Sequence, residues 1–122
     1  MFPAGRRRAI MSKTRAEIRF KALAILTGWD VGADPSAEDA EALDGYIDSE
    51  IAEINADGTT YIADADDLAD ELFMPFSKLV ANAGADEFGG KSDEAKAMQL
   101  RNRIRVLMRQ TPGYGPQQVE FF

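Results

Sequence analysis

The sequence contains no cysteine and no histidine among its 122 residues. Without cysteine the chain has no disulfide and no thiolate nucleophile, which fits a protein of a reducing compartment. Without histidine it lacks the commonest general base and the commonest metal ligand. These two absences remove most familiar catalytic and metal-binding chemistry, and we expect neither an enzymatic activity nor a cofactor.

Long apolar runs and nucleotide-binding motifs are also missing. No stretch approaches the roughly 18 to 20 apolar residues that a membrane span needs, and the apolar part of MFPAGRRRAIM is too short for a secretory signal. The chain has no G-x-S-x-G elbow, no Walker loop and no dinucleotide fingerprint. We therefore predict a soluble intracellular protein without a membrane partner.

Charge is unevenly distributed along the chain, whose net charge is −7. Residues 1–21 hold seven Lys/Arg and one acidic residue, residues 22–90 hold seventeen Asp/Glu and one lysine, and residues 91–122 hold six basic and three acidic residues. One interpretation is an acidic helical face that solvates the fold. The other is that copies of the chain meet with basic ends against acidic flanks, or that an acidic wall faces an anion that must not bind.

Apolar residues recur at helical spacing in the first half of the chain. A capping box that starts at Thr14 opens a helix that ends near Gly28, and Ser36 opens a long second helix that ends near Gly58. Gly45, inside the second helix, costs about 1 kcal/mol relative to alanine, so it indicates close packing or simple tolerance. The expected buried positions are Ile18, Ala22, Ile25, Leu26 and Trp29, followed by Ala40, Leu43, Ile47, Ile51 and Ile54.

Two further helical segments are predicted in the second half. Residues 59–64, TTYIAD, are β-prone but too short for an independent sheet, so we expect an extended connector. A third helical segment should run from residues 64–67 to Phe88, with a kink or break at residues 73–75 because proline lacks a backbone donor. Ser92 opens the fourth helix. The expected buried positions are Leu68, Leu72, Phe76, Leu79, Val80 and Ala83, followed by Ala97, Leu100, Ile104, Leu107 and Met108.

The predicted fold is therefore all-α, a small bundle of about four helices with an extended C-terminal arm. We divide the chain into a basic N-terminal segment (residues 1–12), a helical domain (residues 13–110) and the arm (residues 111–122). Proline and glycine in QTPGYGPQQVEFF keep the arm from forming a helix. Four apolar side chains of the arm either pack on the chain's own domain or bind a partner: Tyr114, Val119, Phe121 and Phe122.

Residues 53–64, EINADGTTYIAD, nearly match a calcium-binding loop. Glu53, Asn55, Asp57 and Asp64 fall at ligand positions, but both ends depart from the pattern and no partner hand is evident. A glycine-capped helix end followed by an extended link explains the same residues. A calcium-binding helical module remains an alternative.

The basic residues also allow two interpretations. Arg6–Arg8 contacts nucleic acid or an acidic surface, or it belongs to an upstream extension, because Met11 begins MSKTRAEI and resembles a natural start. The arginines of the fourth helix bind phosphate, or they lie as surface residues and intersubunit ion pairs. A small helical nucleic-acid-binding regulator, with the fourth helix as its recognition helix, is the other alternative.

Three segments in this order suggest a family: LTGWDVGADPSAEDAEAL, INADGTTYIAD and FMPFSKLVANAGADEFGG. Together they resemble the head-tail connector (adaptor) proteins of tailed bacteriophages, particularly the tail accessory factors of short-tailed phages and related head completion proteins. The resemblance covers about residues 14–90, and a helix and an arm follow in the expected order. It implies a non-enzymatic virion protein of the neck, between head and tail, assembled in the host cytoplasm.

The resemblance also implies partners and contact residues. Such proteins form rings, typically of twelve subunits, that dock under the portal protein, extend the DNA channel and offer a platform for tail or nozzle proteins. DNA is expected to pass without sequence-specific binding, because an acidic wall does not bind phosphates. The resulting site predictions are portal contact for Tyr114, Val119, Phe121 and Phe122, and subunit or portal contact for Arg101, Arg105 and Arg109.

Overall fold

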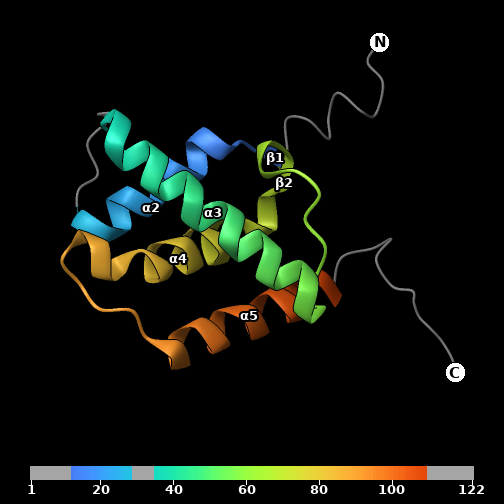
Figure 1. The fold of residues 1–122 in the computed structure, drawn as a ribbon. Coiled ribbons are helices and arrows are strands. Elements are labelled where there is room, and N and C mark those ends of the chain that lie inside the picture. Colours follow the sequence, from blue (N-terminus) through green and yellow to red (C-terminus); the bar gives the residue numbers. More distant parts are fainter. Residues whose placement is uncertain (1–11, 29–34, 110–122) are drawn as a thin grey trace, which may run out of the picture.

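A computed structural model describes residues 12–28 and 35–109, and helices dominate this part of the chain (Figure 1). The prediction of an all-α fold with four helices is confirmed. The elements in chain order are β1 (Ser12–Lys13), α2 (Arg15–Thr27), α3 (Ala37–Asp57), η1 (Ala65–Asp67), β2 (Leu68–Ala69), η2 (Asp70–Leu72), α4 (Phe73–Ala83), η3 (Ala85–Phe88) and α5 (Glu94–Arg109).

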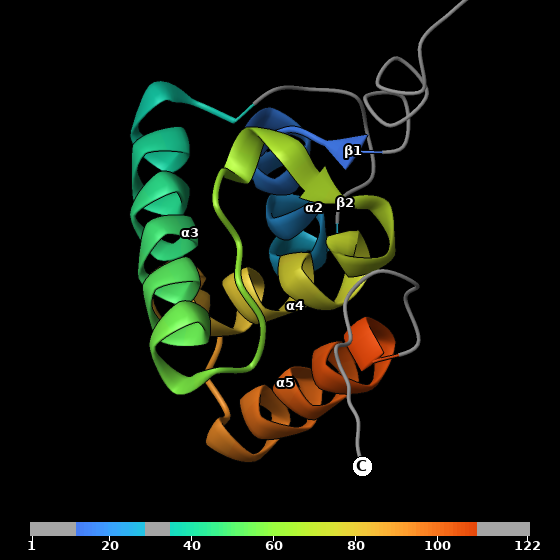
Figure 2. The same ribbon diagram turned by 90° about the vertical axis from the view of Figure 1, so that its right-hand side faces the viewer.

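Helix α4 is the centre of the fold because it packs against each of the other three helices. In Figure 1, α3 crosses in front of α4 and α5 runs below it, and in Figure 2 the same α3 stands to one side of α2 and α4. A helix surrounded on most sides must be apolar on most faces. The sequence of α4 meets this requirement, since its buried residues are Pro75, Phe76, Ser77, Leu79, Val80 and Ala81.

Side-chain caps and glycines with positive φ define the ends of α2 and α3, as predicted. Thr14 Oγ1 accepts a hydrogen bond from the Glu17 N–H at 3.3 Å, and Glu17 Oε1 accepts one from the Thr14 N–H at 2.8 Å. Ser36 Oγ caps α3 by accepting a hydrogen bond from the Asp39 N–H at 3.2 Å. Gly28 and Gly58 end the two helices with φ values of 67° and 79°, where a side chain would be strained.

One predicted buried position on α2 is wrong. Ile25 is 38% exposed, and Leu23, which the helical spacing had not selected, is 5% exposed. Helix α2 packs against both α3 and α4, so its buried side is wider than a single stripe. Ile25 instead borders a surface hollow beside α4.

The predicted third helix is wrong over its first part, although its break lies where expected. Two 3₁₀ turns and the short strand β2 occupy residues 65–72, and β2 pairs antiparallel with β1, with Leu68 opposite Lys13. Helix α4 begins only at Phe73. Pro75 therefore lies in the first helical turn, where a backbone N–H has no intrahelical partner, and proline is tolerated there. Residues 59–64 form a connector without helix or strand, as expected.

Gly45 faces open space on the outside of α3. Apart from its chain neighbours and the nearby backbone of α3 itself, no atom of the described residues lies within 4 Å of the position that a Cβ would take. We expect Gly45→Ala to raise the free energy of unfolding by about 0.5–1 kcal/mol, because the helix gains propensity without a clash. Urea denaturation of the two chains measures the difference. Gly58→Ala is the matched control and should be less stable, since Gly58 has a positive φ. A loss of stability in Gly45→Ala would contradict the expectation.

Candidate functional site

Arg101, the first of the three predicted contact arginines, lies between α5 and α3 and pairs within its own chain. Its Nη2 lies 3.1 Å from Glu50 Oε1 and 2.5 Å from Glu53 Oε1. The Arg101 and Glu50 side chains are only 14% and 10% exposed. This ion pair therefore joins two helices that are distant in sequence, and most of the guanidinium surface is covered.

Glu50 is the carboxylate that the sequence did not single out. Burial raises the pKa of the Glu50 carboxyl group, and the charge and hydrogen bond of Arg101 oppose that shift. Nearby Glu53 and Glu94 add repulsion and raise the pKa further. A buried carboxyl group with a raised pKa is a feature of many catalytic sites, but ion-pair networks between helices shift pKa values as well. The arginine partner and the position between two helices fit the second case.

Arg105 and Arg109 are more accessible. Arg105 Nη1 donates to Asn102 Oδ1 at 2.7 Å and its Nη2 donates to Thr59 Oγ1 at 3.1 Å, while Asp57 Oδ2 lies 3.9 Å away. The Arg105 side chain is 42% exposed, and Arg109 is exposed at the end of α5. Both side chains are accessible to solvent, and their contact with a subunit or portal stays a prediction.

The predicted portal-binding arm lies outside the described residues. This applies to Tyr114, Val119, Phe121 and Phe122, and also to Trp29 and the Arg6–Arg8 cluster. Their predicted roles therefore rest on the sequence alone.

The residues of the near calcium loop make other contacts. The Asn55 side chain donates to the Ile62 carbonyl oxygen at 2.9 Å and accepts from the Ile62 N–H at 2.8 Å. Asp57 Oδ1 accepts from the backbone N–H and the hydroxyl group of Thr59, and these hydrogen bonds lower the pKa of Asp57. The two side chains thus hold the turn after α3. Within residues 12–28 and 35–109, no group of three or more acidic residues is placed to hold a metal ion.

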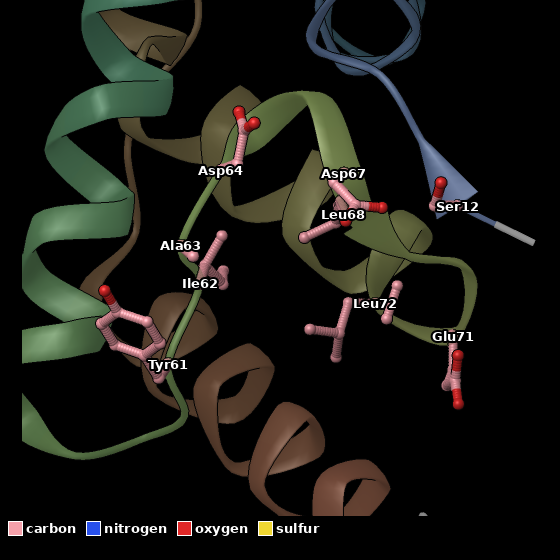
Figure 3. A pocket seen from close by; sticks show the side chains of 10 residues that line it. Ser12, Tyr61, Ile62, Ala63, Asp64, Asp67, Leu68, Glu71 and Leu72 are labelled. Atoms are coloured by element: carbon pink, nitrogen blue, oxygen red, sulfur yellow. The ribbon is translucent and has the colours of Figure 1, made fainter. Parts of the chain in front are cut away.

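A groove of about 450 Å³ opens between the 59–64 connector and the β1–β2 end of the domain (Figure 3). Its lining combines buried apolar residues with exposed carboxylates: Ile62, Leu68 and Leu72, and Asp64, Asp67 and Glu71. Tyr61, 73% exposed, stands beside the opening. This arrangement suits an apolar group that lies next to a cation. The sequence did not reveal it, because the strand pairing brings its parts together.

Comparison with known proteins adds no relative. Neither a family model nor a curated protein nor a solved structure matches this chain. Among the helices of the described residues, none is both long and apolar enough to cross a bilayer.

Proposed function

We propose that the chain is a structural head-tail connector (adaptor) subunit of a tailed bacteriophage, which forms a twelve-membered ring under the portal protein. The ring extends the DNA channel and provides a platform for tail or nozzle proteins. The order of the helical segments supports this proposal, since it is the order on which the resemblance to connector proteins depends.

The observation that carries the proposal is that carboxylates hold neighbouring elements of the folded domain together. Asp44 accepts from Arg15 and Arg19 at 3.4 and 2.9 Å, and thereby ties α3 to α2. Asp86 accepts from the backbone and hydroxyl of Ser92 at 3.0 and 3.2 Å and closes the loop before α5. Contacts of this kind make a rigid helical block. A ring subunit requires rigidity and a charged exterior, and it needs no reactive centre.

The remaining charge fits a channel protein. Part of the basic N-terminal charge is neutralised within the chain, since Lys13 pairs with Asp70 at 3.5 Å and Arg15 with Asp48 at 2.9 Å. Apart from Asp70, residues 64–71 present four more exposed carboxylates, those of Asp64, Asp66, Asp67 and Glu71. Such a surface repels phosphates, so DNA passes it without release of bound counterions and without being held.

A nucleic-acid-binding regulator has less support. Its recognition helix would be α5, yet Arg101 of that helix is paired with Glu50 and Glu53. A protein of this class would be retained on duplex DNA in a salt-dependent way at low micromolar concentration.

Removal of the arm tests the connector function. We expect deletion of residues 112–122 to leave the helical domain folded and to abolish co-sedimentation with a purified portal ring, because a few aromatic anchors carry most of the binding energy of an interface. Circular dichroism checks the fold, and sedimentation with the ring measures binding. Phe121→Ala/Phe122→Ala is the matched variant that keeps the Pro/Gly segment, and it should also fail to bind. Unchanged binding by the truncated chain would contradict the proposal.

A further inference from the structure

A surface groove follows α4 on the side that faces away from α3. It consists of two hollows of about 220 and 290 Å³ along α4, and Lys78 lines both. Ile25 at the end of α2 and Met74 on α4 line the hollows and are 38% and 42% exposed. Leu100 of α5 closes the other wall. We call this surface, which is lined by Ile25, Met74, Lys78 and Leu100, the α4 groove.

The α4 groove is cationic in an acidic protein. Lys78, Lys91, Lys96 and Arg103 line it, and Glu71 is the one carboxylate among its lining residues. None of these four cations forms an ion pair with a carboxylate of the described residues. The chain has 21 acidic and 14 basic residues, so partners of opposite charge are abundant. An apolar groove flanked by four cations that lack an ion-pair partner within residues 12–28 and 35–109 is therefore suited to an acidic partner.

The groove and α3 lie on opposite sides of α5. Arg101 and Arg105 point to α3 and its C-terminal turn, where they pair with Glu50 and Thr59. Leu100 and Arg103 line the groove instead. At 3.6 residues per turn, positions 100 and 103 lie on a different face of the helix from positions 101 and 105. A partner in the groove thus leaves the α3 surface of the same copy free.

The outward face of α3 has the complementary character. Glu41, Gly45, Asp48, Ala52 and Ala56 recur every three or four residues and are all exposed. We call this set the acidic stripe. Its small residues allow another surface to approach the helix backbone closely, and its two carboxylates stand on the same face. Asp48 also pairs with Arg15 of its own chain, whereas Glu41 forms no ion pair with a cation of the described residues. The open space at Gly45 belongs to this stripe.

We propose that the α4 groove of one copy binds the acidic stripe of α3 from a second copy. The contact is a helix in an apolar groove, with carboxylates of the stripe against lysines of the rim and with Ile25 and Met74 covered. The apolar floor favours a helix over a nucleic acid backbone. Because groove and stripe are different surfaces of one chain, the contact is heterologous and closes into a ring when the rotation between copies permits. The inference deepens the proposed connector function and rests on it for the ring.

Disulfide trapping tests the contact directly, because the chain has no cysteine of its own. A mixture of Ala52→Cys and Met74→Cys chains should cross-link about tenfold faster than a mixture of Ala52→Cys and Met98→Cys chains, since docking raises the effective concentration of the paired thiols. Met98 is the matched control, because it is 60% exposed on α5 and lies outside both surfaces. Asn82→Cys probes the other end of the groove with the same expectation. Equal rates in all mixtures would overturn the inference.

Charge reversal tests the direction of the contact. Lys78→Glu/Lys96→Glu disables the groove and Glu41→Lys/Ala52→Lys disables the stripe, all at exposed positions. Each variant alone should fail to assemble, whereas a mixture should associate again, because the intact groove of one variant meets the intact stripe of the other. Sedimentation velocity measures the species. Assembly of either variant like the unchanged chain, or a mixture that stays monomeric, would contradict the contact.

Portal binding separates this inference from the connector function. If groove variants bind the portal ring but lose docking-dependent cross-linking, the contact between copies depends on the groove and the connector function does not. Loss of portal binding on deletion of the arm, with cross-linking intact, supports both. Retention of the unchanged chain on duplex DNA, lost in Lys78→Glu/Lys96→Glu, would identify the groove as a phosphate site and overturn the proposed contact.

Discussion

Replacement of Arg101 with methionine is expected to lower the free energy of unfolding by about 3 kcal/mol at neutral pH. The substitution leaves the Glu50 carboxylate, whose side chain is 10% exposed, without its counter-charge between α3 and α5. Breaking a buried ion pair in this way typically costs about 3–5 kcal/mol, because an uncompensated charge remains. We expect the lower end of that range, since the carboxylate keeps an edge near the solvent. Urea denaturation at pH 7 measures the loss.

The loss should shrink as the pH falls. Burial already raises the pKa of Glu50 above its ordinary value of about 4.5, and removal of Arg101 raises it further, because the arginine lowers it. A carboxyl group whose pKa is higher in the folded state binds its proton more tightly there. Its contribution to stability is therefore greatest below the unfolded pKa and declines as the pH rises through the folded pKa. Arg101→Met should thus be closest in stability to the unchanged chain near pH 4.5 and furthest from it at pH 7.

Two further variants distinguish the stability effect of the unpaired buried charge from that of lost packing. Glu50→Leu/Arg101→Met removes both charges and should recover most of the stability, since apolar residues often replace buried ion pairs without loss. Arg109→Met, an exposed arginine on the same helix, should change stability by less than about 0.5 kcal/mol. A pH-independent loss in Arg101→Met would mean that the side chain acts through its apolar contacts alone.

The ends of the helices were predictable because they depend on neighbouring residues. The capping box at Thr14, the Ser36 cap and the glycines with positive φ act over three or four positions of the chain, so the sequence displays them directly. The same holds for the apolar periodicity of α3 and α5. Leu43, Ile47 and Ile54 of α3 are buried as expected.

Residues 64–72 could not be predicted in the same way. Their conformation depends on the pairing of β2 with β1, which joins Leu68 to Lys13 across more than fifty positions. The acidic residues of this segment are compatible with a helix start, so local preference favoured the wrong structure. The groove beside Tyr61 depends on the same distant pairing and was missed for the same reason.

The Glu50–Arg101 pair illustrates a signal that was present but unused. An acidic face that solvates the fold would leave its carboxylates in water, yet Glu50 lies three residues after Ile47 and four before Ile54, on the buried side of α3. Helical spacing alone places a charge there inside the fold, and a buried charge requires a partner. The partner is on α5, 51 residues away, and only the packing of the two helices identifies it.

Phe76→Ala is expected to cost about 4 kcal/mol, the largest effect of a single substitution in this domain. Phe76 is completely buried in α4, the helix that packs against α2, α3 and α5. A cavity there has helices on several sides, so the movement of one neighbouring helix cannot fill it. The loss of stability should therefore lie well above the transfer free energy of the removed ring. Since small domains are stable by about 5–15 kcal/mol, the variant should show a much lower urea midpoint and melting temperature.

Two other aromatic residues provide a graded comparison for Phe76. Phe73 is partly buried at the start of α4, with Lys13 Nζ 5.2 Å from its ring centre, so Phe73→Ala should cost less than Phe76→Ala. Tyr61 is 73% exposed, and Tyr61→Ala should change the stability by less than about 0.5 kcal/mol. Urea denaturation of the three variants should rank them in the order of their burial. Equal losses for Phe76→Ala and Phe73→Ala would mean that the core closes around the missing ring, and that α4 is not the rigid centre on which the other helices pack.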